Sequence, residues 1–312
     1  MTLPDRICDP HHHLWEVPGM EYTPDDLLTD LATVPQVTST VFVECDAWYR
    51  SSGPEHLRVV GETEWVVANG PAIIAGIVGA GDLRLGPRTA EMLEAQVDAG
   101  AGRFRGIRQR ATWDAHPSIR PGVPYVGQGL LRDPWFDRGF TILESMGLTF
   151  DAWLYFPQLP DLIALARAHP DATIVLNHLG GPITLGPYHD RAATHATWRG
   201  LLSEVARCEN VVLKVGGHGM PMYLGRRRLD AGADRSAPFE PDAVVDLWGD
   251  AIRFSIDAFG PDRCMFESNF PVDKLSMSYA TLWEAFDLIT NGWSPHERAA
   301  LFHDTAARTY RI

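Results

Sequence analysis

Eight short runs of apolar, β-branched residues alternate with longer segments of helical character, and this alternation constrains the fold of the 312-residue chain most. Runs such as Thr-Ile-Val-Leu-Asn are continuously apolar, which is typical of parallel strands buried on both faces. They lie at residues 6–14, 38–45, 72–79, 104–109, 148–155, 172–178, 211–217 and 264–271. Eight strands with helical crossovers predict an α/β fold, a single (β/α)₈ TIM barrel over residues 1–312. A doubly wound sheet is the alternative, but it usually has a Gly-rich phosphate turn where this chain has histidines.

The segments between the strands carry helix signals. Residues 87–100 predict a helix with Met92, Leu93 and Val97 on its apolar side, ending at a glycine. Asp133-Pro134 predicts a helix start, because proline is tolerated in the first turn. Residues 294–297, Ser-Pro-His-Glu, form a capping-box pattern at a further helix start.

Charge and composition exclude several classes of protein. The chain has 27 Lys+Arg against 40 Asp+Glu, a net charge of −13, so we expect no nucleic-acid partner and no anionic membrane surface. No apolar run approaches the ~20 residues of a membrane helix. The first residues lack the apolar core of a signal peptide, and we expect a cytoplasmic protein. The cysteines are isolated and form no zinc-ribbon pattern: Cys8, Cys45, Cys208 and Cys264.

Candidate ligands for a metal ion cluster at the end of the first predicted strand, which reads Asp-Pro-His-His-His-Leu-Trp over 9–15. Side chains alternate along a strand, so His11 and His13 point one way and His12 points the other. Two neutral imidazoles on the inward face suit a shared zinc ion. We therefore interpret His11 and His13 as functional and His12 as a packing or hydrogen-bonding residue behind them.

A third histidine ends the sixth predicted strand. His178 lies where the strand gives way to a Gly-Gly-Pro turn, so its ring is expected at the same mouth of the barrel. With His11 and His13 it would complete a three-histidine arrangement that leaves a position open for water.

Three segments together resemble the signature segments of the amidohydrolase-related family, within the amidohydrolase superfamily. They are residues 9–15, residues 177–182 (Asn-His-Leu-Gly-Gly-Pro) and residues 265–271 (Met-Phe-Glu-Ser-Asn-Phe-Pro); 104–108 and 302–310 are similar to further family segments. The resemblance implies a (β/α)₈ barrel and a hydrolase, often a sugar lactonase or a pyrone-dicarboxylate lactonase, with decarboxylases among the relatives. It also implies that His11, His13 and His178 face the site.

One position departs from the family pattern. Such families end strand eight with an aspartate that binds the metal or activates water, and this chain has Asn269 there. An amide cannot act as the usual general base. Glu267, two residues earlier, faces the same way, and Glu44 at the end of strand two is a second inward carboxylate, followed by Asp46. Either glutamate could instead form a buried ion pair with a barrel cation.

The expected cofactor is a divalent metal, with zinc favoured, and a metal-independent route stays open. With a metal, bound water is the nucleophile. Without one, His178 or another histidine must position the water.

Substrate recognition is predicted to rest mainly on cations. Arg108 is inward by its spacing on strand four, and a guanidinium suits a substrate carboxylate. Further candidates are Tyr155, Lys214 and His218, although an interior ion pair is the favoured role for Lys214. Long loops follow strands four, six and seven, at 110–129, 182–197 and 217–240, on the expected catalytic face. The last contains the arginines of 226–228, which are equally compatible with a solvated loop.

These observations favour a hydrolase of a small carboxylated or cyclic ester, in first place a lactonase. Water would attack the carbonyl, with Asn269, Glu267, Glu44 and His178 as candidate catalytic groups. One alternative is a non-oxidative decarboxylase of an aromatic or unsaturated acid. Another is a catalytically silent barrel that binds a small acid, supported by Asn269. The partner is a small-molecule substrate, and assembly into a homo-oligomer stays open.

Overall fold

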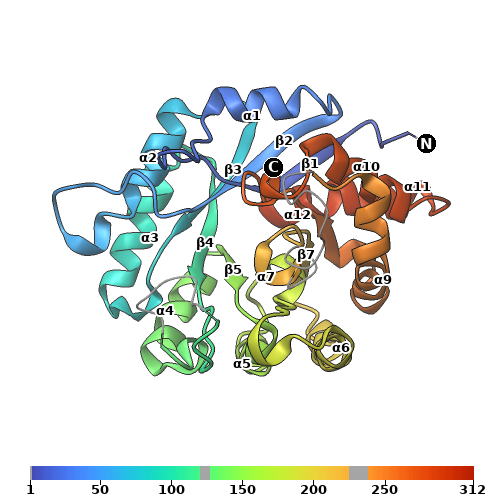
Figure 1. The fold of residues 1–312 in the computed structure, drawn as a ribbon. Coiled ribbons are helices and arrows are strands. Elements are labelled where there is room, and N and C mark those ends of the chain that lie inside the picture. The colour runs from blue at the N-terminus through green and yellow to red at the C-terminus, as the bar shows by residue number, and fades with distance from the viewer. Residues whose placement is uncertain (1, 120–126, 225–237) are drawn as a thin grey trace.

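A computed structural model describes residues 2–119, 127–224 and 238–312 and confirms the TIM barrel. Eight parallel strands form one sheet in sequential order, with helices around it (Figure 1). The strands are β1 (Ile7–His12), β2 (Val37–Val43), β3 (Ile74–Ala80), β4 (Phe104–Arg110), β5 (Thr149–Trp153), β6 (Ile174–Leu176), β7 (Val211–Val215) and β8 (Cys264–Phe266).

Backbone contacts between the first strand and the segment after the last one close the barrel. The His13 amide donates to Phe270 O at 2.8 Å, and the Asn269 amide donates to His11 O at 2.8 Å. These bonds lie at the carboxyl ends of β1 and β8. Closure therefore takes place where the histidines of the first strand are found.

Eleven described helices accompany the strands, and the predicted start signals are confirmed. Asp133 caps α4 by accepting from the Trp135 amide at 2.8 Å, and Ser294 with Glu297 forms a capping box on α11. One detail was wrong: Val97 is 41% exposed, because the buried side of α3 runs along Met92 and Leu93. The helices are α1 (Pro24–Leu31), α2 (Val60–Asn69), α3 (Arg88–Ala99), α4 (Pro134–Ser145), α5 (Leu159–Ala168), α6 (Arg191–Ala206), α7 (Pro221–Leu224), α9 (Pro241–Phe259), α10 (Tyr279–Ile289), α11 (Pro295–Ala299) and α12 (Thr305–Tyr310).

The sixth and eighth strands are shorter than the sequence predicts. The apolar runs suggested 172–178 and 264–271, whereas β6 and β8 have three residues each. The chain leaves the extended conformation where functional side chains begin: φ is 52° at His178, 56° at Leu179 and 54° at Asn269. Residues with positive φ thus follow two residues after the end of β6 and three residues after the end of β8, so neither strand can continue through them.

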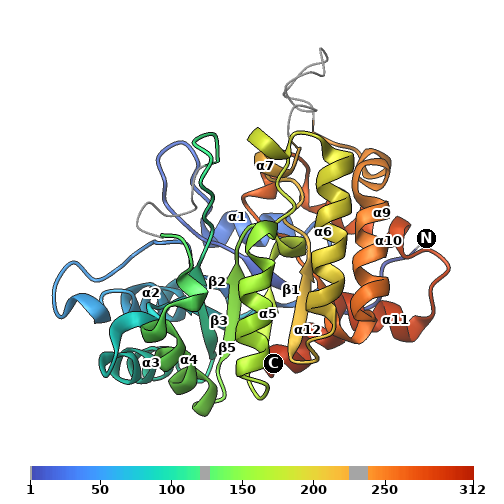
Figure 2. The same cartoon turned by 90° about the horizontal axis from the view of Figure 1, so that it is seen from below.

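The two ends of the barrel have different roles. Figure 2 shows α7, which follows β7, at one end and α12 with the C-terminus at the other. Tyr310 and Ala306 of α12 pack into the barrel against inward strand residues, among them Val41, Val175 and Met265. The C-terminal helix therefore fills the floor of the barrel, opposite the end where the functional side chains gather.

Among the described helices, none has both the length and the apolar composition needed to span a membrane. Parts of two predicted loops, including the arginines of 226–228, lie outside the described residues.

Candidate active site

Three side chains from distant segments meet inside the carboxyl rim of the barrel. His11 lies on β1, His178 two residues after the end of β6 and Glu267 directly after β8, and all three are buried. One potential ligand atom from each lies within 4.8 Å of the others. The His13 ring lies 5.0 Å from the His11 ring, and the His178 ring 4.5 Å from it, measured between centroids. The structure thus brings the sequence-predicted histidines and Glu267 together.

The two carboxylate oxygens of Glu267 have different surroundings. Oε1 accepts hydrogen bonds from His178 Nδ1 at 2.7 Å and from the His178 amide at 3.2 Å. Oε2 lies 2.7 Å from His11 Nδ1, but without the alignment of a hydrogen bond, and no other described group donates to it. A buried oxygen without a donor is unfavourable unless something else interacts with it. Oε2 is therefore the atom of this cluster that is available for chemistry.

Glycines at the end of β7 leave room for this arrangement. A Cβ on Gly217 would lie 2.4 Å from His178 Nδ1, and a Cβ on Gly216 would lie 2.3 Å from Glu267 Cγ. Gly217 also has a φ of +65°, which favours glycine. The Val-Gly-Gly sequence at this strand end therefore lets His178 and Glu267 approach each other.

His13 and His12 face different sides of β1, as the alternation predicts. His13 Nδ1 contacts Val43 O at 2.8 Å, so this nitrogen donates and Nε2 carries the lone pair. The His13 ring also stacks on Trp15 at 5.7 Å. His12 Nε2 lies 3.0 Å from Thr40 Oγ1 on the other side.

Burial keeps the three site histidines neutral. It is the main reason that the pKa values of His11, His13 and His178 fall well below the usual value. Arg108 adds to the effect at all three, and Lys214 adds to it at His11 and His178. Burial also raises the pKa of Glu267 to about 8, although Lys214 opposes this. Neutral imidazoles can ligate metal or accept a hydrogen bond, and a carboxyl group with such a pKa can exchange protons near neutral pH.

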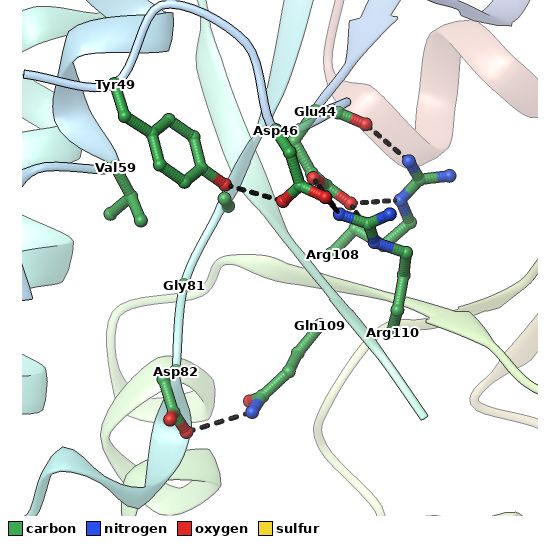
Figure 3. A pocket seen from close by; sticks show the side chains of 10 residues that line it. Glu44, Asp46, Tyr49, Val59, Gly81, Asp82, Arg108, Gln109 and Arg110 are labelled. Carbon is green, nitrogen blue, oxygen red and sulfur yellow. Dashed lines mark hydrogen bonds and ion pairs between the residues drawn. The ribbon is translucent and has the colours of Figure 1, made fainter. Parts of the chain in front are cut away.

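Arg108 is bound by Glu44 rather than free in the mouth of the barrel. Its Nε lies 2.6 Å from Glu44 Oε1, and its Nη2 donates to Glu44 O. Its Nη1 faces His11 Nε2 at 3.3 Å. Glu44 also contacts Arg110, which in turn pairs with Asp46 (Figure 3). Only the Nη1 side of the Arg108 guanidinium is thus directed at the histidines.

A small cavity of about 100 Å³ lies beside this ion-pair network. Figure 3 shows Asp46, Tyr49 and Arg110 on one side of it and Asp82 with Gln109 on another. The Tyr49 hydroxyl donates to Asp46 Oδ1 at 3.1 Å. The side chains that line this wall of the barrel mouth include acidic and basic groups, and they form hydrogen bonds with one another.

Lys214 lies inside the barrel in an ion pair. Its Nζ is 2.8 Å from Asp151 Oδ2 and 3.3 Å from His11 Nδ1. The Tyr310 hydroxyl contacts both oxygens of Asp151, at 3.0 and 2.9 Å. Sequence reasoning missed Asp151 and Tyr310. The alternation along β5 that turns Trp153 inward also turns Asp151 inward and could have identified it.

Asn269 lies at the rim with its amide engaged. Its Nδ2 donates to Asp273 Oδ1 at 2.9 Å, and the Gly219 amide donates to Asp273 Oδ2 at 3.0 Å. Burial raises the pKa of Asp273 to about 8. Asp273, also missed from the sequence, is a second buried carboxyl group near this strand end.

The two remaining candidates are Tyr155 and His218. Tyr155 lines a cavity of about 220 Å³ with Ile119 and Ile183, and its ring is 5.9 Å from that of Trp153, which in turn contacts His178. Burial raises the Tyr155 pKa to about 12. His218 is fully buried, both its ring nitrogens lack a hydrogen-bond partner among the described residues, and burial lowers its pKa to about 3.

The cluster fits a divalent metal. Neutral imidazole nitrogens and one carboxylate are ligands that zinc accepts in catalytic sites. Glu267 Oε2 is buried without a hydrogen-bond partner among the described residues, and it lies within ligand distance of both imidazoles. His11, His178 and Glu267 are therefore the residues that could hold such an ion.

Comparisons with known proteins agree with this architecture. The amidohydrolase family model matches residues 8–312. The uncharacterized protein y4mH of Sinorhizobium fredii is 32% identical over 331 residues, covering 98% of each chain. An L-fucono-1,5-lactonase of Burkholderia multivorans is 32% identical over 244 residues, covering 77% of this chain and 73% of that one. A crystal structure of a Burkholderia multivorans amidohydrolase with bound zinc has a TM-score of 0.75 and 25% identity, covering 98% of this chain and 99% of that one. Since the family model matches nearly the whole chain, this protein belongs to the amidohydrolase family.

Proposed function

We propose that this protein hydrolyses a small lactone at the cluster of His11, His178 and Glu267. The observation that carries the proposal is the unpartnered Oε2 of Glu267, buried beside two neutral imidazoles at the carboxyl rim of the barrel. A proton acceptor in such a site can activate water. The similarity to an L-fucono-1,5-lactonase supports a lactone as the substrate.

A divalent ion fits this account as the cofactor, with zinc favoured. His11, His178 and Glu267 would hold it, and His13 Nε2 offers a further lone pair. A bound metal polarises a carbonyl and lowers the pKa of water, which is the chemistry it would supply here.

Glu267 is the proposed proton carrier of the reaction. Its Oε1 is fixed by His178, so in the ionised form of Glu267 Oε2 takes the proton of the water whose oxygen attacks the lactone carbonyl carbon. A carboxylate has lone pairs enough to contact an ion and still accept a proton. When the tetrahedral intermediate collapses, the ring C–O bond breaks and the proton passes from Oε2 to the leaving ring oxygen. The product is a hydroxy acid.

Arg108 and His13 are proposed to orient the reactants. Arg108 Nη1 lies on the His11 side of the guanidinium and can donate to the carbonyl oxygen as negative charge develops there. His13 Nε2 can accept a hydrogen bond from the attacking water, because Nδ1 already contacts Val43 O. Glu44 holds Arg108 in place from the opposite side.

The experiment is a pH-stat assay of the purified protein on a panel of neutral and carboxylated lactones. We expect acid release with at least one of them and its loss in His178→Asn. A panel without acid release would contradict the proposal. Release of carbon dioxide from aromatic or unsaturated acids would instead identify the decarboxylase alternative.

A further inference from the structure

A chain of buried polar contacts joins the C-terminal helix to the candidate site. The Tyr310 hydroxyl contacts Asp151, Asp151 pairs with Lys214 at 2.8 Å, and Lys214 Nζ lies 3.3 Å from His11 Nδ1. All four side chains are buried. Tyr310 is on α12 at the barrel floor, so this chain spans the interior from the floor to the site (Figure 2).

The carboxylate of Asp151 is held by three donors. Besides Tyr310 and Lys214, Asn177 Nδ2 donates to Oδ2 at 3.0 Å. A buried ion pair is costly unless hydrogen bonds complete it, and apolar residues of similar size often replace one without loss of stability. The layer below consists of such residues, including Val41 and Val175. Stability therefore does not explain why charges occupy this layer.

We propose that Tyr310 is a positioning residue of the active site, which acts through Asp151 and Lys214 on His11. The hydroxyl fixes the Asp151 carboxylate, and the carboxylate fixes the ammonium group against Nδ1 of His11. If the Asp151 carboxylate does not hold it, the Lys214 ammonium group can turn toward Glu267, whose Oε2 lies 2.7 Å from His11 Nδ1. The orientation of His11 and the availability of Glu267 Oε2 thus depend on the C-terminal helix. The catalytic consequence rests on the proposed function, whereas the effect on His11 does not.

The chain contains a matched control for this arrangement. The Tyr22 hydroxyl donates to Asp30 Oδ2 at 2.7 Å, and Lys274 Nζ lies 2.7 Å from the same oxygen. Each lysine also lies over its tyrosine ring, at 5.1 Å for Lys274 and 5.2 Å for Lys214. In the described structure no hydrogen bond joins the Tyr22 triad to the histidine cluster.

The test compares Tyr310→Phe with Tyr22→Phe in the full chain. Each substitution keeps the ring and removes one hydroxyl bonded to an aspartate. The imidazole ¹⁵N resonances of histidine-labelled protein are recorded without substrate, with His11→Asn identifying the His11 signals. We expect the His11 signals to move in Tyr310→Phe and to stay in Tyr22→Phe. On the best lactone we expect kcat to fall about 10- to 100-fold in Tyr310→Phe, with KM little changed, as for residues that orient a catalytic group.

Unchanged His11 signals and an unchanged kcat in folded Tyr310→Phe would overturn the inference. If that variant does not fold, Asp151→Asn removes the carboxylate charge at nearly constant shape, and the same outcomes apply. If the wild-type protein hydrolyses no lactone, the proposed function fails. The resonance comparison still decides the inference in that case, because it needs no turnover.

Discussion

The substitution Gly217→Ala tests whether this glycine leaves the room that the His178 ring needs, apart from its effect on the stability of the fold. At φ +65° an alanine costs about 1–2 kcal/mol in backbone strain. Its Cβ would lie 2.4 Å from His178 Nδ1, whereas ordinary contacts begin at 3.4 Å, so the ring must move by the difference of 1.0 Å. The His178–Glu267 hydrogen bond is only 2.7 Å long and cannot be kept through such a shift. A misplacement of about 1 Å can cost on the order of 100-fold in rate.

Gly102→Ala is the matched control. Gly102 has a φ of +81°, and no atom lies within 4 Å of the added Cβ, so this variant has the backbone strain without the clash. Urea unfolding should show a loss of stability from backbone strain in both variants and a further loss from the clash in Gly217→Ala. Lactone hydrolysis should fall about 100-fold only in Gly217→Ala. Equal activity of the two variants would refute the reasoning that Gly217 makes room for His178.

Three other predictions concern single groups. Burial raises the pKa of Asp273 to about 8 in the folded protein, against about 4 for an ordinary aspartate, so the folded state binds this proton more tightly than the unfolded state. The resulting stabilisation is complete below about pH 4 and is lost as the pH rises through 8. Between pH 6 and 8 this loss is about 2 kcal/mol by linkage, and urea unfolding of Asp273→Asn should not show it. Asn269→Asp brings two carboxyl groups within 2.9 Å, which should steepen the fall of stability with pH without improving turnover; turnover that appears only in this variant would support a silent natural barrel. Asp133→Ala removes the cap of α4 and should cost about 1 kcal/mol in thermal unfolding with unchanged activity, since the cap bond to the Trp135 amide involves no residue of the cluster.

The barrel could be predicted from the sequence because its signals are local. Each strand is an apolar run, and caps such as Asp133 and Ser294 are read from a few adjacent residues. The ends of β6 and β8 were placed too late, at 178 and 271, because the positive φ values at His178 and Asn269 oppose the extended conformation that apolar residues favour. Such turns depend on packing within the closed barrel.

The candidate site was predictable only in part. Alternation along one strand is local and identified His11 and His13. The pairing of Glu267 with His178, and of Arg108 with Glu44, depends on which side chains meet across the barrel, which the sequence does not encode locally. Tyr310 and Asp151 are 159 residues apart in the sequence. They meet only because α12 packs into the floor of the barrel, which no local pattern indicates.

Glu267→Gln tests the central claim most directly, because glutamine keeps the shape of the side chain and removes its ability to take a proton. The measurement is the initial rate of acid release from the best lactone at constant pH. The exposed pair of Glu64 with Arg50 provides the control variant, Glu64→Gln. The account predicts a loss of at least about 100-fold for Glu267→Gln and none for the control. A Glu267→Gln protein that releases acid as fast as the wild type would contradict it.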